Sequence, residues 1–111
     1  MKTDNIFLAT IEIKKGDMRD YVLSSMCAYF KSNKIDTFIA LNVDKEAKSL
    51  RDSTQMDVSS IWQLADQLQL EYFEINKNMT LIVEESRSND FEYLLNMFFG
   101  FGAKVILLKN I

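Results

Sequence analysis

Few of the side chains that usually carry out catalysis occur in this chain of 111 residues. Histidine is absent, which removes the commonest general base, metal ligand and member of a catalytic triad. Cys27 is the only cysteine, so the chain can form neither an intrachain disulfide nor a zinc site built on cysteines. It lies within a predicted helix, with neither a helix N-terminus nor a cationic histidine beside it to lower its pKa. We therefore interpret Cys27 as an unreactive, structural thiol.

Carboxylates are plentiful, but their spacing favours no particular reaction. Glu84 and Glu85 end a predicted strand, and adjacent residues of a strand point to opposite faces of the sheet. Asp4 with Glu12-Ile13-Lys14 matches a short pattern of some metal-dependent nucleases, although so loose a pattern often arises by chance. The acids of residues 44–57 could assist a magnesium ion, and solvated surface carboxylates are the simpler interpretation. No glycine-rich phosphate loop occurs either. We therefore expect no common enzyme class, no cofactor and no metal.

Six basic residues form the remaining group of side chains that could bind a ligand. They follow the first and second predicted strands and are Lys14, Lys15, Arg19, Lys45, Lys48 and Arg51. If the two strands are parallel, both groups meet at the carboxyl edge of the sheet, where α/β proteins often bind ligands. There they could bind phosphate, a nucleotide, nucleic acid or an acidic protein. Acidic residues are interleaved with them, so an ordinary surface of mixed charge is the competing interpretation.

The hydrophobic pattern predicts a single domain over residues 1–111, with one sheet of about five strands and three helices packed on it. Strands are predicted at 6–13, 35–43, 71–75, 79–84 and 103–108, and helices at 17–32, 58–68 and 89–99. The polar segment 44–57 is predicted to be a long connection with at most one helical turn. Asn76-Lys77-Asn78 predicts a hairpin between the third and fourth strands, because asparagine tolerates positive φ. The order βαβαββαβ belongs to the α/β or α+β class.

One side of the first predicted helix has the spacing of a core-facing surface. Its apolar side chains recur every three or four residues, at Met18, Tyr21, Val22, Met26 and Tyr29. We therefore predict that these five side chains pack against the sheet.

The third predicted helix, 89–99, is more apolar than the burial of one face requires. Its apolar side chains cover about 240° of the circumference, whereas one buried face needs little more than about 100°. Either further elements cover both sides of this helix, or one face is buried only in a dimer or partner complex. Aromatic and methionine side chains are enriched at protein interfaces. The candidate interface consists of Phe91, Leu94, Leu95, Met97, Phe98, Phe99 and Phe101.

One stretch resembles the Alba superfamily of chromatin- and RNA-binding proteins. Lys14-Lys15 follows the first predicted strand and leads into Met18-Arg19-Asp20-Tyr21-Val22-Leu23, which is similar to the strand, lysine pair and helix of that family. Over residues 6–84 the resemblance implies a strand, a helix, a strand, a helix and a hairpin. It also implies that Lys14 and Lys15 contact nucleic acid. The chain departs from the family in its net negative charge and in the helix and strand predicted after residue 88.

Composition favours a protein of a reducing compartment. The lone cysteine fits such a compartment, and no apolar run approaches the ~18–20 residues of a membrane helix. The net charge is −3, from 13 basic and 16 acidic side chains, whereas a DNA-coating protein normally has a basic excess. We therefore expect a cytoplasmic, non-catalytic interaction or regulatory domain, of the adaptor or inhibitor type, that binds a protein partner or forms a homo-oligomer. A nucleic-acid-binding module that uses the Lys/Arg patch is the alternative.

Overall fold

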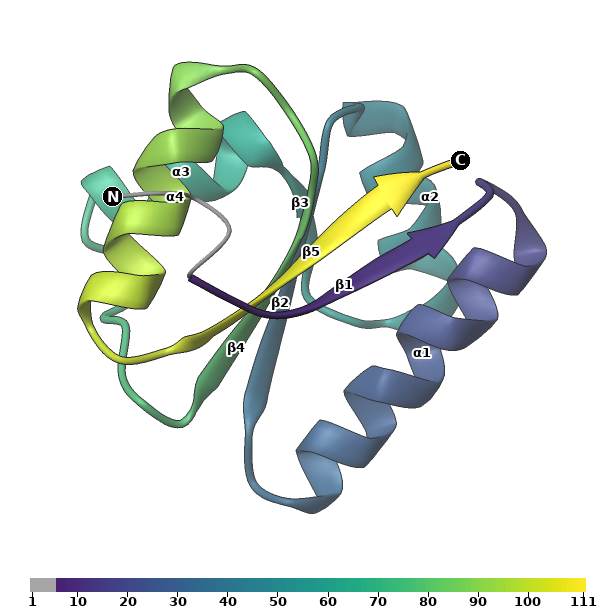
Figure 1. The fold of residues 1–111 in the computed structure, drawn as a ribbon, viewed down its shortest axis with the longest axis horizontal. Coiled ribbons are helices and arrows are strands. Elements are labelled where there is room, and N and C mark those ends of the chain that lie inside the picture. Colours follow the sequence, from purple (N-terminus) through teal and green to yellow (C-terminus); the bar gives the residue numbers. More distant parts are fainter. Residues whose placement is uncertain (1–5) are drawn as a thin grey trace.

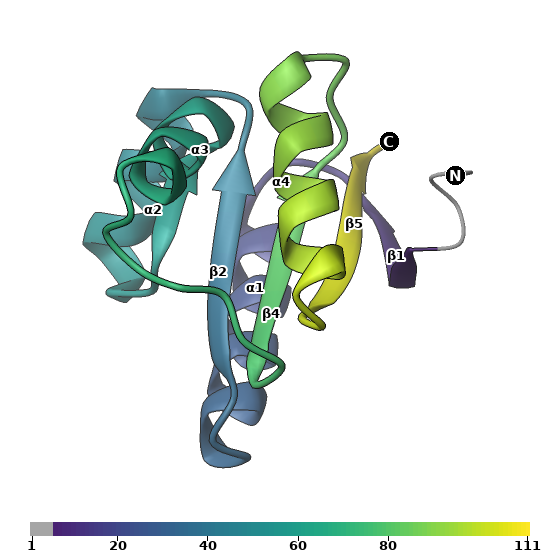
Figure 2. The same ribbon diagram turned by 90° about the vertical axis from the view of Figure 1, so that its left-hand side faces the viewer.

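A parallel sheet of five strands lies between two layers of helices in the computed structural model, which describes residues 6–111 (Figure 1). In chain order the elements are β1 (Phe7–Ile13), α1 (Asp17–Ser32), β2 (Asp36–Leu41), α2 (Asp44–Thr54), β3 (Val58–Ser60), α3 (Ile61–Gln69), β4 (Met79–Glu84), α4 (Asn89–Gly100) and β5 (Lys104–Asn110). The strand order in the sheet is β1-β5-β4-β2-β3, and every pairing is parallel. Helices α3 and α4 cover one face, and α1 and α2 cover the other (Figures 1 and 2).

The central strands are apolar on both faces because each face is covered by helices. In β4, Leu81 and Val83 point into the core beneath α3 and α4, while Ile82 points into the core beneath α1 and α2. A parallel sheet covered on both sides produces such continuous apolar strands. The same alternation turns Glu84, the last residue of β4, toward the α1/α2 face.

The parallel strands β2 and β4 are neighbours in the sheet, but the connections that follow them lie on opposite faces. After β2 the chain passes through α2 on one face, and after β4 it passes through α4 on the opposite face. The carboxyl ends of two such strands form a topological switch point, which is the usual position of ligands in open α/β sheets. This edge is therefore the first place to look for a site.

The predicted α/β class and the single sheet of five strands are confirmed, but the number of helices is wrong. Residues 44–54 form α2 rather than an irregular connection, so the described residues contain four helices. Only Ala47 and Leu50 of α2 are buried, and they pack beneath it in the α1/α2 core. Two apolar positions among charged residues are too few to reveal a helical period in the sequence.

The predicted hairpin of strands 71–75 and 79–84 is also wrong. Residues 71–75 are irregular, and β4 is a central strand that pairs in parallel with β2 and β5. A missed short strand, β3, replaces the predicted one, so the strand number is right while one strand is different. The predicted helix 58–68 begins only at Ile61, because the side chains of Ser60 and Gln63 form a capping box there.

The face of α1 that packs on the sheet differs from the predicted one. Arg19 and Leu23 are buried, whereas Tyr21 and Tyr29 are 70% and 66% exposed. Both sides of this helix carry residues at spacings of three and four, and the buried side contains a charged residue. Met26 of the predicted stripe does pack partly against the α1/α2 core, while Met18 is exposed like the two tyrosines, so spacing alone gave only part of the buried side.

Candidate functional site

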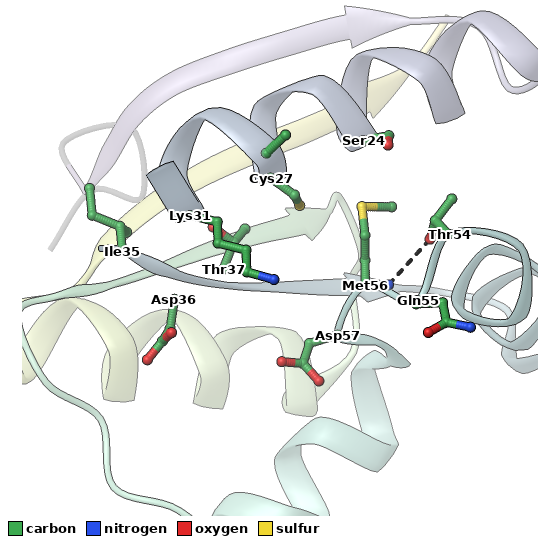
Figure 3. Close-up of a pocket in the computed structure, with 11 residues that line it drawn as sticks. Ser24, Cys27, Lys31, Ile35, Asp36, Thr37, Thr54, Gln55, Met56 and Asp57 are labelled. Carbon is green, nitrogen blue, oxygen red and sulfur yellow. Dashed lines mark hydrogen bonds between the residues drawn. The ribbon is translucent and has the colours of Figure 1, made fainter. Parts of the chain in front are cut away.

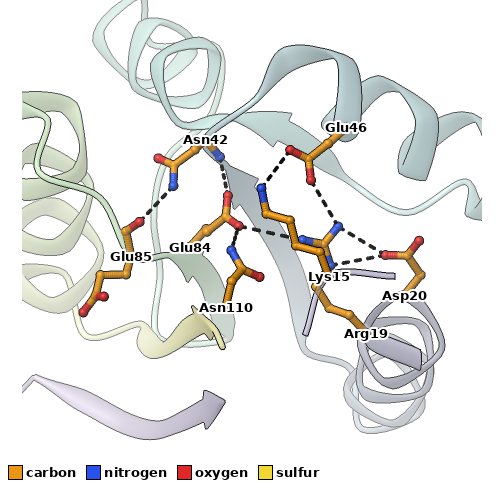
Figure 4. A network of polar contacts seen from close by, with 8 residues as sticks. All are labelled: Lys15, Arg19, Asp20, Asn42, Glu46, Glu84, Glu85 and Asn110. Atoms are coloured by element: carbon orange, nitrogen blue, oxygen red, sulfur yellow. Dashed lines mark hydrogen bonds and ion pairs between the residues drawn. The ribbon is translucent and has the colours of Figure 1, made fainter. Parts of the chain in front are cut away.

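A buried carboxylate joins three strand ends at the switch point. Glu84, 1% exposed, accepts a hydrogen bond of 2.8 Å from the backbone N–H of Asn42, just after β2. Its other oxygen accepts one from the side-chain amide of Asn110, the last residue of β5. The Asn42 side chain donates to the carbonyl oxygen of Glu85 at 2.8 Å. Figure 4 shows these contacts closing the carboxyl edge between β2, β4 and β5.

Arg19 connects this carboxylate to both helices of the α1/α2 face. It lies in the first turn of α1 and is 5% exposed. Its Nη1 atom is 3.7 Å from Oε2 of Glu84, and its Nη2 atom is 3.6 Å from Oε1 of Glu46 in the first turn of α2. Lys15 donates to the other oxygen of Glu46 at 3.2 Å, and Asp20 lies 3.4 Å from Arg19 Nε. One guanidinium thus links β4, α1 and α2 (Figure 4).

The switch point is filled by the protein's own charges. Two cations, Lys15 and Arg19, face three carboxylates, those of Asp20, Glu46 and Glu84. Buried charges require partners of this kind, because an unpaired buried ion loses its hydration and gains no hydrogen bond or ion pair in exchange. Arg19 Nη1 is buried and has no hydrogen-bond partner among residues 6–111. Its position depends on its charged neighbours, and the geometry indicates a structural network.

The six basic residues predicted to form an anion-binding patch do come from adjacent segments, but four of them are engaged internally. Besides Lys15 and Arg19, Lys48 pairs with Asp52 at 2.8 Å, and Arg51 donates to the carbonyl oxygen of Val58 at 2.9 Å. The hydrogen bond and charge of Lys48 lower the pKa of Asp52. The two remaining patch residues, Lys14 and Lys45, are exposed and have no ion pair within residues 6–111.

A cavity of about 330 Å³ opens at the opposite, amino edge of the same face. It lies between α1, the start of β2 and the connection from α2 to β3 (Figure 3). Cys27, Thr37 and Met56 line it, together with exposed charged residues from the strand start and the connection. The hydroxyl oxygen of Thr37 is buried there without a hydrogen-bond partner in the described residues.

The thiol in this cavity is held in its protonated form. Burial, together with the smaller effect of the negative charge of Asp57, raises the pKa of Cys27 from 9.0 to about 11. Because the thiolate is the nucleophilic form, this environment suppresses reactivity. The raised pKa agrees with the interpretation of Cys27 as an unreactive thiol.

Four of the seven predicted interface residues lie in the core and must be removed from the candidate surface. Phe91, Leu94, Leu95 and Phe98 are buried beneath α3 and α4. The wide apolar arc of α4 exists because α3 covers one side of the helix and the sheet covers another. Met97 is half-buried, while Phe99 and Phe101 are 39% and 61% exposed.

The last turn of α4 separates a groove from a smaller hollow. The groove, about 550 Å³, is lined by Leu68, Phe73, Ile75, Met97 and Phe101, with Glu71 and Glu74. The hollow, about 290 Å³, lies on the β1 side and is lined by residues that include Leu8, Phe99, Gly102 and Lys104. The turn lies between β1 and the connection that follows α3 (Figure 2).

Several large apolar side chains around this turn are exposed. We call them, with the groove and the hollow, the corner surface. Leu8, Phe99 and Phe101 are its exposed lining residues, and the exposed Leu70 and Tyr72 belong to the connection after α3 that lines the groove at Glu71 and Phe73. Phe73 gives the groove a fixed wall, because its ring stacks on Phe38 at a centroid distance of 5.0 Å. The corner surface is therefore a shaped apolar region rather than a set of scattered side chains.

Sequence reasoning missed residues at both ends of the sheet. Strand alternation separates Glu84 from Glu85, but a carboxylate at the end of a largely apolar strand is itself a signal of a buried charge. Tyr72 was missed because 71–75 was predicted to be a strand.

Comparison with known proteins identifies no relative: the chain matches no protein-family model and no curated protein. The resemblance to the Alba superfamily thus depends on Lys14-Lys15 and the helix after them, and the hairpin that it implies is not formed by residues 71–84.

Within residues 6–111, no helix has the length and apolar character needed to cross a membrane. No group of three potential metal ligands is found in the same range, and Asp4 of the nuclease-like pattern lies outside it.

Replacing Arg19 with methionine tests the structural role of the network. The change keeps an apolar stem but leaves Glu84 and Glu46 without their shared cation. We expect the free energy of unfolding to fall by about 3 kcal/mol, as for other broken buried ion pairs, measured by urea denaturation. In the matched control, Lys48→Met removes an exposed pair and should leave stability unchanged. An Arg19→Met variant as stable as the wild type would contradict this role.

The raised pKa of Cys27 predicts slow alkylation. At pH 8 a thiol with a pKa of about 11 holds about a hundredfold less thiolate than one at 9.0, so iodoacetamide should react about a hundredfold faster with urea-unfolded protein. Since folding favours the protonated thiol, its contribution to stability is complete below pH 9.0 and is lost as the pH rises toward 11. Cys27→Ser should reduce that alkaline loss. Equal alkylation rates in the folded and unfolded states would show that the thiol is not protected.

Proposed function

We propose that this protein is a non-catalytic interaction domain that acts through protein–protein contacts, as a small adaptor or inhibitor. The observation that carries this proposal is the corner surface. Phe101 is more than half exposed at a groove of about 550 Å³, and Leu8 is more than half exposed at the smaller hollow. Contiguous exposed apolar patches on folded domains usually mark interaction sites.

The composition of this surface also supports the proposal. Aromatic side chains and methionine are enriched at the cores of protein interfaces, and three of the exposed members of the corner surface are aromatic. Interfaces gain most of their binding energy where an anchor side chain fills a pocket of the partner. The groove can receive such an anchor, and Phe101 at its margin can serve as one.

The carboxyl edge offers less support for a binding function. Its switch point is occupied by Glu84, which contacts both Asn42 and Arg19. A second hollow, beside the start of α4, has balanced charges: Glu85 and Glu92 against Arg87 and Lys109. The nucleic-acid alternative is weakened in the same way, because phosphate binding needs cations that are free to replace counterions.

The contribution of Phe101 to partner binding can be measured by affinity capture with a matched control. Phe101→Ser removes an exposed ring of the corner surface, and Tyr21→Ser removes an equally exposed ring from α1. We expect proteins retained by the immobilised wild-type chain to be lost with Phe101→Ser and kept with Tyr21→Ser, as quantified by mass spectrometry. Both variants should unfold at wild-type urea concentrations, since neither ring is buried. Identical retention by all three proteins would count against the corner surface.

A further inference from the structure

We propose that the partner of the corner surface is a second copy of this chain, related to the first by a two-fold axis near the last turn of α4. This inference rests on the proposed function and names its partner. It depends on how the apolar and charged residues are distributed on the two sides of that turn.

The last turn of α4 presents different side chains to its two sides. Met97 and Phe101 are four residues apart, so they lie on the same side of the helix and both line the groove. Phe99 is two residues from Met97 and therefore points about 200° away around the helix axis. It lines the hollow next to Leu8 of β1. Both sides of the turn are thus apolar at their centre.

The charges on the two sides have opposite signs. On the groove side, Glu71 and Glu74 are the charged lining residues among residues 6–111. On the hollow side, Lys104 is the charged lining residue in the same range. Lys77 is next to Gly102, another residue that lines the hollow, because the Lys77 Cβ is 3.7 Å from the position that a Cβ on Gly102 would occupy. The corner surface therefore has an acidic side and a basic side, with apolar residues between them.

A surface divided in this way is complementary to itself. In a two-fold interface the same patch is used by both copies, so the groove side of one copy faces the hollow side of the other. Glu71 and Glu74 then face Lys77 and Lys104 twice, once in each direction. Such complementarity matters here because the chain carries a net charge of −3, and two copies would otherwise repel each other.

Charge reversal on each side provides a specific test by sedimentation equilibrium of the full chain over roughly 1–500 μM. Glu71→Lys with Glu74→Lys makes both sides basic, and Lys77→Glu with Lys104→Glu makes both sides acidic. Each double variant should self-associate about tenfold more weakly than the wild type, or worse, because like charges then face each other. An equimolar mixture of the two variants should form a heterodimer.

The matched control carries the same charge change as the Lys77/Lys104 variant, at a distance from the corner surface. Lys14→Glu with Lys45→Glu alters two exposed lysines at the carboxyl edge and should self-associate more strongly than the Lys77/Lys104 variant, because the corner surface is unchanged. Urea denaturation of all variants should give wild-type stability, since every altered side chain is exposed.

Three results would overturn the inference. The first is a wild-type chain that stays monomeric over the whole concentration range. The second is a dimer that neither reversal weakens, which would place the contact elsewhere. The third is a pair of weakened variants whose mixture fails to associate. The capture experiment separates the two proposals if the wild-type chain is a monomer. Loss of a captured protein with Phe101→Ser would then reject the dimer but support the proposed function. Equal capture by Phe101→Ser and Tyr21→Ser would reject the dimer and the proposed function together.

Discussion

The carboxylate of Glu84 lies where three strands end and two helices begin, and it loses almost all of its hydration there. Its burial follows from the alternation of β4, which turns every second side chain toward α1 and α2. A buried ion of this kind is tolerated only with partners, and the partners come from distant segments: Asn42, Asn110 and Arg19. The arrangement of α1 and α2 at the carboxyl edge therefore depends on this one group.

This constraint separates the charged network of the carboxyl edge from the proposed binding surface. The edge at which open α/β sheets usually hold ligands is occupied by internal hydrogen bonds and ion pairs. A shaped group of exposed apolar residues, which includes Leu8, Phe99 and Phe101, lies instead around the turn between α4 and β5, at the amino edge of the sheet. There, Phe99 and Phe101 lie on either side of a short ridge, and oppositely charged residues border its two sides. The proposed recognition surface therefore lies at one edge of the sheet, and the structural network lies at the other.

The sequence predicted the elements whose hydrophobic pattern was long and regular. The helices of α1 and α4 and the strands of β1, β2, β4 and β5 were found because each has many apolar residues in one period. Helix α2 was missed because only Ala47 and Leu50 carry its period, and the strand direction of β4 was missed because a local Asn-Lys-Asn turn signal competed with distant pairing. The site was harder to predict. Burial of Phe91, Leu94, Leu95 and Phe98 depends on where α3 packs, and the engagement of Arg19 depends on strand order, neither of which a linear pattern contains.

The central claim is that contacts form at the corner surface while the carboxyl edge remains unchanged. A dilution series of ¹⁵N-labelled protein, followed by amide NMR spectra, tests this directly because it reports every backbone position at once. We expect concentration-dependent shifts in residues 70–77 and 99–104, with constant signals from Asn42, Glu84 and Tyr21. Shifts centred on Asn42 and Glu84, with an unchanged corner surface, would contradict this claim.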